Sequence, residues 1–469
     1  MDSSPPLHRL FERTPIELLQ GFFLHCLPPS PSVAMGYPYH YLGECSPRIA
    51  PLLLCQICRT WRQAAISFPN LWTSLDVVVL DGKARPSAPL VATWLARSGA
   101  LPLSLSLCQF HQSDSLEDNC IAGGEIFELY KQYISRWYNI HFDLMGPRYT
   151  FPIAQRSAPM LNSFSMESSY SFFPDVFGIF DFVPCLSNLH VPAIPNLNHL
   201  GDCSMQIPWF QLASLSLNYI PSICASLHIL EKCPNLTDAS FKIDLHDTLP
   251  LNHLVHHKLR SLTINIRQDH LSLFLGHVTF PALIQATINL RQTYEWPQGK
   301  LEEFLERSQC KLVQLEIHHK GMNYTAFTAC VRNRHLQSLV RFLVHDTRDC
   351  KGPFITKQAI GLLTCSSCDN INMSKRRGIT RVGDSGCFLP NLESISIRGT
   401  PLWTDDGMVA SMVESRWRFH HCKRLKNLAI EVPASHVEDI RRLQELRREG
   451  LELDLYIDLM ACCPRAQSE

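Results

Sequence analysis

A short leucine pattern returns ten times between residues 161 and 430 of this 469-residue chain. Each copy has a leucine, two further residues, an apolar residue, one residue and a second apolar residue. The ten copies are Leu161/Phe164/Met166, Leu186/Leu189/Val191, Leu212/Leu215/Leu217, Leu236/Ala239/Phe241, Leu259/Leu262/Ile264, Leu283/Ala286/Ile288, Leu312/Leu315/Ile317, Leu339/Phe342/Val344, Leu392/Ile395/Ile397 and Leu425/Leu428/Ile430. Their first leucines are separated by 25, 26, 24, 23, 24, 29, 27, 53 and 33 residues. Units of this length share their apolar faces with neighbours, so the pattern predicts a stack of units around one continuous core.

Each copy predicts a short strand, and the residues between copies leave room for a helix. Helical spacing of apolar residues appears in three of the intervening segments: Ser222 to Cys233, Leu301 to Ser308 and Asp406 to Trp417. The separation of 53 residues is about twice the others, so it predicts a degenerate unit or an insertion between His345 and Leu389. The expected fold class is therefore α/β, an irregular array of strand–helix units.

The chain closes with a pattern typical of a capping unit. Residues 437–449 place Ile440, Leu443 and Leu446 on one side of a predicted helix and charged residues on the other. Gly450 is expected to end this helix, and the alternating segment 451–457 is expected to form the last strand.

Two helices are predicted before the repeats. The first begins near residue 14, where Thr14 suits an N-cap, Pro15 the first helical position and Glu17 a capping box. The second is predicted from about Ile49 to Ser67, after a loop at 28–47 rich in proline, glycine and serine. Both helices are too apolar for a segment of this size to bury alone, which indicates a partner.

Composition narrows the choice of partner and compartment. The chain is 45% hydrophobic and 18% charged, which suits a packed core, and its 43 basic residues equal its 43 acidic residues. A nucleic-acid partner is not expected at zero net charge. No basic segment followed by an apolar one opens the chain, and no apolar run reaches the roughly 18 residues that span a membrane. We expect an intracellular protein, cytoplasmic or nuclear, without a membrane partner, whose 19 cysteines are mostly reduced core residues.

The N-terminal segment resembles the F-box domain. The matching residues are Pro15, Glu17, Leu18, Leu19, Phe22 and Phe23, then Leu54, Cys55, Ile57, Cys58, Trp61, Arg62 and Ala65, and finally Pro69, Leu71 and Trp72. The chain as a whole resembles the fungal families of F-box proteins with leucine-rich-repeat-like C-terminal regions. The resemblance implies an F-box at 7–75, a linker with the first irregular strand–helix units at 76–150, and a leucine-rich-repeat-like solenoid with a C-terminal cap at 151–460.

In such families the F-box binds a Skp-type adaptor and, through it, a cullin ubiquitin ligase, while the repeats recruit a protein substrate. The resemblance therefore implies a substrate receptor that is not itself an enzyme and has no catalytic, cofactor or metal residues. The residues expected to bind the adaptor are Pro15, Leu18, Leu19, Phe22, Phe23, Ile57, Cys58, Trp61, Leu71 and Trp72. The alternative for any one of them, above all the two tryptophans, is packing within the chain. The alternative for the protein is an interaction scaffold outside a ligase.

Sequence signals for catalysis, metal binding or anion binding are weak. The segment 383–386, Gly-Asp-Ser-Gly, resembles the start of a serine-protease motif but lacks the following glycine, so a turn is expected. Cys365 and Cys368 have the spacing of a metal knuckle, yet two further ligands are only loosely placed, so free thiols are expected. The basic segment 416–426 is expected to be a solvated face rather than an anion-binding patch. The basic run 374–377 is too short to indicate nuclear import.

Overall fold

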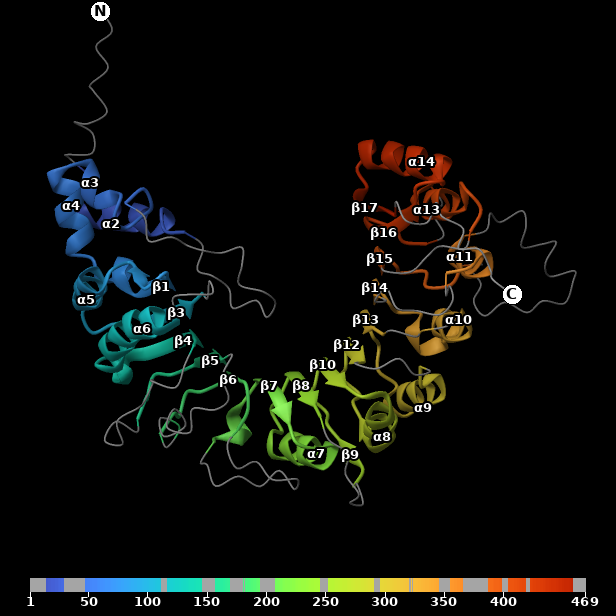
Figure 1. Cartoon of the computed structure of the whole chain (residues 1–469), viewed down its shortest axis with the longest axis horizontal. Helices are drawn as coiled ribbons and strands as arrows, with labels where there is room; N and C mark the ends of the chain where they lie inside the picture. The colour runs from blue at the N-terminus through green and yellow to red at the C-terminus, as the bar shows by residue number, and fades with distance from the viewer. Residues whose placement is uncertain are drawn as a thin grey trace, which may run out of the picture. The chain divides into compact units, whose positions relative to one another are not determined.

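The computed structural model of the chain describes residues 14–28, 47–110, 116–145, 157–168, 180, 182–194, 207–244, 252–290, 296–319, 322, 324–345, 355–365, 387–398, 404–418 and 422–458. It is mixed α/β, with a large, mostly parallel sheet and twelve α-helices within these residues (Figure 1). The expected α/β class is therefore confirmed. The chain divides into two compact units, unit 1 (Met1–Asn196 with Cys203–Ser216) and unit 2 (Leu197–Asp202 with Leu217–Glu469). The domain boundaries suggested by the sequence stay predictions.

Unit 1 begins with helices and continues with strands. Its helices are α2 (Ile16–His25), α3 (Leu54–Ile57), α4 (Arg59–Ile66), α5 (Ala88–Arg97) and α6 (Leu116–Lys131), with 3-10 turns at Pro69–Trp72, Ile134–Arg136 and Trp209–Gln211. Its strands are β1 (Ser74–Leu80), β2 (Lys83–Arg85), β3 (Leu103–Gln109), β4 (Trp137–Leu144), β5 (Ser163–Ser168) and β6 (Asn188–Val191). They lie in the order β6-β5-β4-β3-β1-β2, and every pair is parallel except the β1–β2 hairpin. Strand β7 (Ser214–Ile220) spans the division between the units.

Unit 2 alternates strands and helices almost without exception. Its helices are α7 (Ile223–Lys232), α8 (Gln268–His277), α9 (Gln298–Ser308), α10 (Tyr324–Arg332), α11 (Lys357–Leu363), α13 (Met408–Arg418) and α14 (Val437–Arg448), with a 3-10 turn at Arg334–Leu336. The strands β8 (Asp238–Ile243), β10 (Ser261–Ile266), β12 (Gln285–Leu290), β13 (Gln314–His318), β14 (Arg341–His345), β15 (Ser394–Arg398), β16 (Asn427–Pro433) and β17 (Glu452–Asp458) lie side by side in that order, all parallel. Two short strands, β9 (Leu254–Val255) and β11 (Val278–Thr279), pair separately.

The repeated pattern coincides with the strands. In all ten copies the two apolar partners fall on β5 to β8, β10 and β12 to β16, the leucine lies two residues before the strand, and all three side chains are buried. Because neighbouring strands are in register, the second apolar position forms a continuous ladder in unit 2: Ile264, Ile288, Ile317, Val344, Ile397 and Ile430. A buried side chain of this size contributes roughly 1.5–3 kcal/mol, and a slip of one residue would turn each side chain to the other face. The regular spacing of the pattern therefore fixes the register of the array.

Helices α7 to α11 and α13 lie on one side of the unit 2 strands in the part of the chain that the structure describes (Figure 1). Alternate residues of a strand face opposite sides of its sheet, so the buried ladders face these helices and the polar residues between them face away. Helix α7 shows why these residues form helices locally. The Ser222 hydroxyl accepts a hydrogen bond from the Ala225 amide at 3.1 Å, and Ile223, Leu227 and Leu230 are buried along one side.

The predicted stop at Gly450 is confirmed. Gly450 has φ of 108°, a conformation that glycine adopts without strain. Its amide donates to the Arg447 carbonyl at 3.1 Å, and the Leu451 amide donates to the Leu446 carbonyl at 3.0 Å. These two bonds are the Schellman motif, which satisfies carbonyls at the end of α14 and turns the chain into β17.

In the described part of the long interval, no additional strand separates β14 from β15. Strand β14 pairs directly with β15, from Arg341 with Ser394 to His345 with Arg398. The described part of the interval contains α11, which takes the place that a helix has in the other units. The interval is therefore an insertion into one strand–helix unit.

Candidate docking surface on the N-terminal helices

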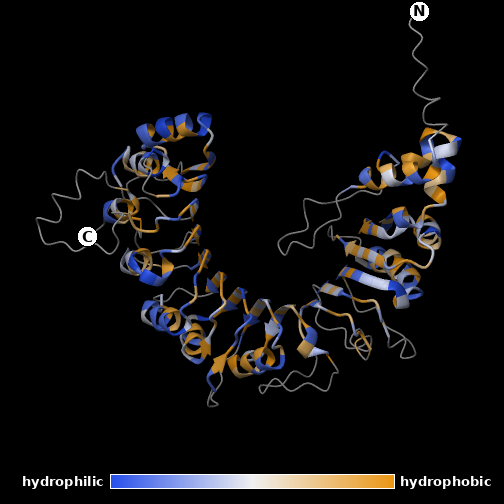
Figure 2. Ribbon diagram, turned by 180° about the vertical axis from the view of Figure 1, so that it is seen from behind, coloured by the Kyte–Doolittle hydropathy of each residue, from blue (hydrophilic) through white to orange (hydrophobic). Residues whose placement is uncertain are grey.

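The N-terminal helices expose several large apolar side chains. Leu18 and Phe22 are four residues apart on α2, so they share one side of that helix, and their exposed fractions are 65% and 52%. Ile57, the last residue of α3, is 52% exposed. We call the exposed large apolar side chains of α2 and of the segment 53–57 the docking surface: Ile16, Leu18, Phe22, Leu24, Leu53 and Ile57. Figure 2 shows hydrophobic colour on the N-terminal helices, whereas α14 is mostly hydrophilic.

A small aromatic core supports this surface from within. Phe23 is fully buried, and its ring centroid lies 4.9 Å from that of Trp61 on α4. The Phe22 ring meets the same indole edge-on at 6.3 Å, although half of Phe22 is exposed. Leu19 is buried beside them on α2. Aromatic pairs of this kind contribute about 0.5–1.5 kcal/mol beyond burial. The core therefore fixes α2 against α4 and holds Phe22 in place.

The predicted single helix at 49–67 is wrong in two respects, since α3 begins only at Leu54 and the chain leaves the helical conformation at Cys58. Cys58 is extended, with φ of −156° and ψ of 174°, and its Sγ accepts a hydrogen bond from the Trp61 amide at 3.4 Å. Arg62 Nε donates to the Cys55 carbonyl at 2.7 Å, which satisfies an acceptor at the end of α3. A side chain that caps a new helix competes with continuation of the old one. The break ends α3 at Ile57, whose side chain stays exposed.

The first helix also starts one residue later than expected. The N-cap position is Pro15 rather than Thr14, with α2 beginning at Ile16. Proline at this position has φ of −52° and ψ of 142°, so it lies outside the helix. The predicted helix is confirmed and its predicted cap is wrong by one position.

Trp72 ties the helices to the first strand–helix unit. It is fully buried, and its indole Nε1 donates to the Ala65 carbonyl at 2.8 Å. Its ring meets Trp94 of α5 edge-on at 4.9 Å, and the Arg97 guanidinium lies 4.6 Å from its centroid. Leu71 is buried beside it. Trp72 is thus a structural link within unit 1.

The ten residues expected to bind an adaptor therefore separate into two groups. The exposed ones include Leu18, Phe22, Ile57 and Cys58, with Pro15 preceding α2. The buried ones pack within the chain: Leu19, Phe23, Trp61, Leu71 and Trp72. The sequence does not distinguish the two groups, because both have the helical spacing of an apolar face. For the buried group, the structure favours packing over direct contact with a partner.

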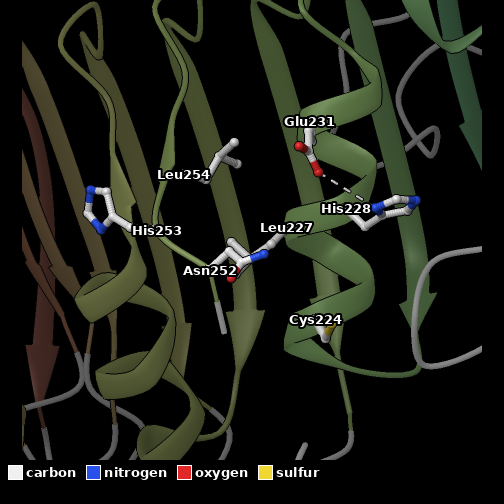
Figure 3. A pocket seen from close by; sticks show the side chains of 7 residues that line it. All are labelled: Cys224, Leu227, His228, Glu231, Asn252, His253 and Leu254. Carbon is white, nitrogen blue, oxygen red and sulfur yellow. Dashed lines mark ion pairs between the residues drawn. The ribbon is translucent and has the colours of Figure 1, made fainter. Parts of the chain in front are cut away.

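A hollow lies beside α7. It is lined by Cys224, Leu227, His228, Glu231, Asn252, His253 and Leu254 (Figure 3). His228 Nδ1 and Glu231 Oε2 lie 3.7 Å apart on one turn of the helix. His253 Nε2 lies 2.9 Å from the Thr279 hydroxyl and is engaged there. Both histidines of the lining therefore have partners within the chain.

A carboxylate cluster at the C-terminal end is structural. The Asp406 carboxylate accepts hydrogen bonds from the Glu438 and Asp439 amides at the start of α14, at 3.0 and 2.9 Å. Asp439 in turn accepts from the Ala410 amide in α13 at 2.7 Å, and its second oxygen lies 3.1 Å from His436 Nδ1. These carboxylates cap each other's helices, where the helix dipole favours negative charge. Their lone pairs are used within the fold.

In the basic segment 416–426, Arg418, Lys423, Arg424 and Lys426 are exposed, as expected of a solvated face, whereas Arg416 is not. Arg416 is buried, the Arg424 guanidinium lies 3.4 Å from the Trp417 ring centroid, and Lys426 Nζ pairs with Glu393 at 2.7 Å. Residues 419–421 lie outside the described residues, as do the segments 374–377 and 383–386 and the cysteine at 368.

Comparisons with known proteins do not assign the chain to a family. No protein-family model matches it. No curated protein matches it closely enough to count as a relative. Among the helices that the structure describes, none has the length and apolar character needed to cross a membrane.

Proposed function

We propose that this protein is an F-box substrate receptor: its N-terminal helices bind a Skp-type adaptor, and its strand–helix array binds a protein substrate. In this proposal the array is an irregular leucine-rich-repeat solenoid, and ubiquitin transfer is performed by other subunits of a cullin ligase. The observation that carries the proposal is the exposure of Leu18, Phe22 and Ile57 over a core built from Phe23 and Trp61.

The exposed apolar side chains and the aromatic core beneath them together support docking of a partner rather than packing within the chain alone. Large apolar side chains exposed together are typical of protein–protein contact, and aromatic anchors dominate the energy of such interfaces. Holding Phe22 against Trp61 reduces the entropy that the side chain loses on binding. The resemblance of the same residues to an F-box identifies the occupant as a Skp-type adaptor.

The open face of the unit 2 strands suits a protein substrate. The side chains between the buried ladders form a row of mostly small polar groups: Ser240, Thr263, Thr287, Glu316, Leu343 and Ser396. Beside it, His345 Nε2 lies 3.0 Å from the Ser396 hydroxyl, and His318 Nε2 lies 2.7 Å from Glu316 Oε1. Such a surface offers hydrogen-bond donors and acceptors along several strands, as in other repeat arrays that bind proteins.

Co-purification with ligase subunits tests the proposal. The full chain is expressed with a Skp-type adaptor and a cullin, and the bound subunits are quantified. Recovery of both supports the receptor function. Recovery of the adaptor without the cullin favours the scaffold alternative, and recovery of neither refutes docking through an F-box.

A matched pair of variants separates docking from general surface effects. Leu18→Asp places a charge on the docking surface, whereas Val437→Asp does the same at a residue of similar exposure on α14, 68% against 65%. We expect loss of the adaptor with Leu18→Asp and full recovery with Val437→Asp. Circular dichroism confirms that both variants remain folded.

A further inference from the structure

Three cysteines from distant segments meet in unit 2. Cys365 follows α11, Cys387 precedes β15 and Cys422 follows α13. The Sγ atom of Cys365 lies 2.6 Å from that of Cys387 and 3.0 Å from that of Cys422. All three Sγ atoms lie within 4.8 Å of one another. Cys365 and Cys387 are buried and Cys422 is partly buried, so the cluster belongs to the interior of this unit.

A buried arginine closes one side of the cluster. Arg416 is 1% exposed and donates through Nε to the Leu363 carbonyl at 2.6 Å and through Nη2 to the Phe388 carbonyl at 2.7 Å. Its Nη2 also lies 3.4 Å from Cys387 Sγ. Among the described residues, no carboxylate pairs with this guanidinium. A buried cation is costly unless an anion compensates its charge, so the arrangement calls for negative charge at the sulfur atoms.

We propose that Cys365, Cys387 and Cys422 bind one zinc ion as thiolates in a structural site. On binding, each thiol releases one proton to solvent, and Zn²⁺ forms three Zn–S bonds. The resulting group carries a net charge of −1, from two positive and three negative charges, and the adjacent Arg416 compensates it. The guanidinium N–H directed at Cys387 Sγ would donate a hydrogen bond to the thiolate and stabilise its negative charge.

The geometry suits this metal with little movement. Zn–S bonds of about 2.3 Å in a tetrahedron place neighbouring sulfur atoms roughly 3.8 Å apart. The sulfur atoms therefore need to separate by about an ångström from their present distances of 2.6 and 3.0 Å. Three thiolates leave the fourth position of zinc to a water molecule, which reaches the site on the side of the partly buried Cys422. Soft sulfur ligands select zinc over calcium or magnesium.

Other roles for the cluster are less consistent with its surroundings. A redox or nucleophilic cysteine is partly exposed to its reagents, whereas Cys365 and Cys387 are only 4% and 7% exposed.

The sequence indicated Cys365 as a possible ligand but paired it with Cys368, which lies outside the described residues. The proposed ligands are 22 and 57 residues from Cys365, so no local motif identifies them. The proposal thus replaces our initial expectation of no metal.

The site would connect both ends of the insertion to the array. Cys365 and Cys387 flank residues 366–386, and Cys422 joins them to the segment that enters β16. The Ser415 hydroxyl already accepts a hydrogen bond from the Cys365 amide at 3.0 Å, which aligns α13 with the end of α11. A metal at this position would cross-link the end of α11 to the segments that precede β15 and β16.

Metal analysis of the purified full chain tests the proposal. The protein is expressed with zinc in the medium, purified under reducing conditions without chelator, and its metal content is measured by plasma mass spectrometry. We expect about one zinc per chain, and its loss in Cys365→Ser and Cys422→Ser. Cys310→Ser is the matched control, because Cys310 is also buried in unit 2, at 2% exposure, but lies outside the cluster. That variant should keep its zinc.

A second measurement on the wild-type chain avoids dependence on folding of the variants. Zinc is exchanged for Co²⁺, and thiolate ligation is detected by sulfur-to-cobalt charge-transfer absorption. Bound metal should also protect the three cysteines from alkylation. The proposal is overturned by a metal-free chain, by zinc that survives both cluster variants, by cobalt spectra without thiolate bands, or by a Cys365–Cys387 disulfide in the reduced preparation.

Discussion

Two adjacent phenylalanines provide a sharp test of the division between docking surface and supporting core. Phe22 and Phe23 have the same chemistry and neighbouring backbone positions, but Phe22 is 52% exposed and Phe23 is fully buried. Replacing each by alanine should therefore have very different effects on the local stability of α2.

The magnitudes follow from burial and ring contacts. Phe23→Ala removes a buried ring from its 4.9 Å contact with Trp61 and leaves a cavity, a change that costs about 3–5 kcal/mol. Phe22→Ala loses about half of a phenylalanine's burial, roughly 1 kcal/mol, and part of an edge contact worth about 0.5–1.5 kcal/mol. The difference between the two variants should be at least about 1 kcal/mol.

Hydrogen exchange measures these local free energies without assuming two-state unfolding of the whole chain. Each 1.4 kcal/mol is about tenfold in the opening equilibrium. Protection of amides in α2 and α4 should fall about 100-fold or more in Phe23→Ala and about 10- to 30-fold in Phe22→Ala. Equal losses in the two variants would refute the assignment of Phe23 to the core and Phe22 to the surface.

Two further predictions concern stability in each unit. Burial, then the nearby Glu167, raises the pKa of Asp143 to about 6, so the folded chain holds this proton more tightly than the unfolded chain. Stability should fall as pH rises from about 4 to 6, by at most about 3 kcal/mol, and Asp143→Asn should flatten that part of a melting-temperature profile. If the melting-temperature profile of Asp143→Asn matched that of the wild type, Asp143 would not be the source of this pH dependence. Ser222→Ala removes the cap of α7 and should cost about 1 kcal/mol, measured as roughly fivefold faster exchange in 223–232; unchanged exchange would exclude a capping role.

The strands could be predicted from the sequence because their pattern is repeated. A leucine followed by two apolar positions fixes which face of each strand is buried. Because every copy has the same spacing, it also predicts how neighbouring strands align. Strand β4 was missed because Trp137, not leucine, occupies its start, although Ile140, Phe142 and Leu144 alternate as buried residues. A search for alternation alone would have found it.

The docking surface could be predicted only as a segment. Helical spacing places Leu18, Leu19, Phe22 and Phe23 on one broad apolar face, but it does not show which half Trp61 covers. The break between α3 and α4 at Cys58 could not be predicted either, because a cysteine N-cap has no strong signature in sequence. The cysteine cluster could not be predicted from the sequence for a different reason. Its three members are far apart in the chain and come together only in the folded array.

Direct binding to a Skp-type adaptor tests the central claim. The full chain is titrated with the adaptor by calorimetry, as wild type, as Leu18→Asp with Ile57→Asp, and as Val437→Asp. We expect the wild type and Val437→Asp to bind alike and the double variant to bind at least about 30-fold more weakly, as for interface anchors worth about 2 kcal/mol or more. No binding by the wild type, or equal binding by all three proteins, would contradict it.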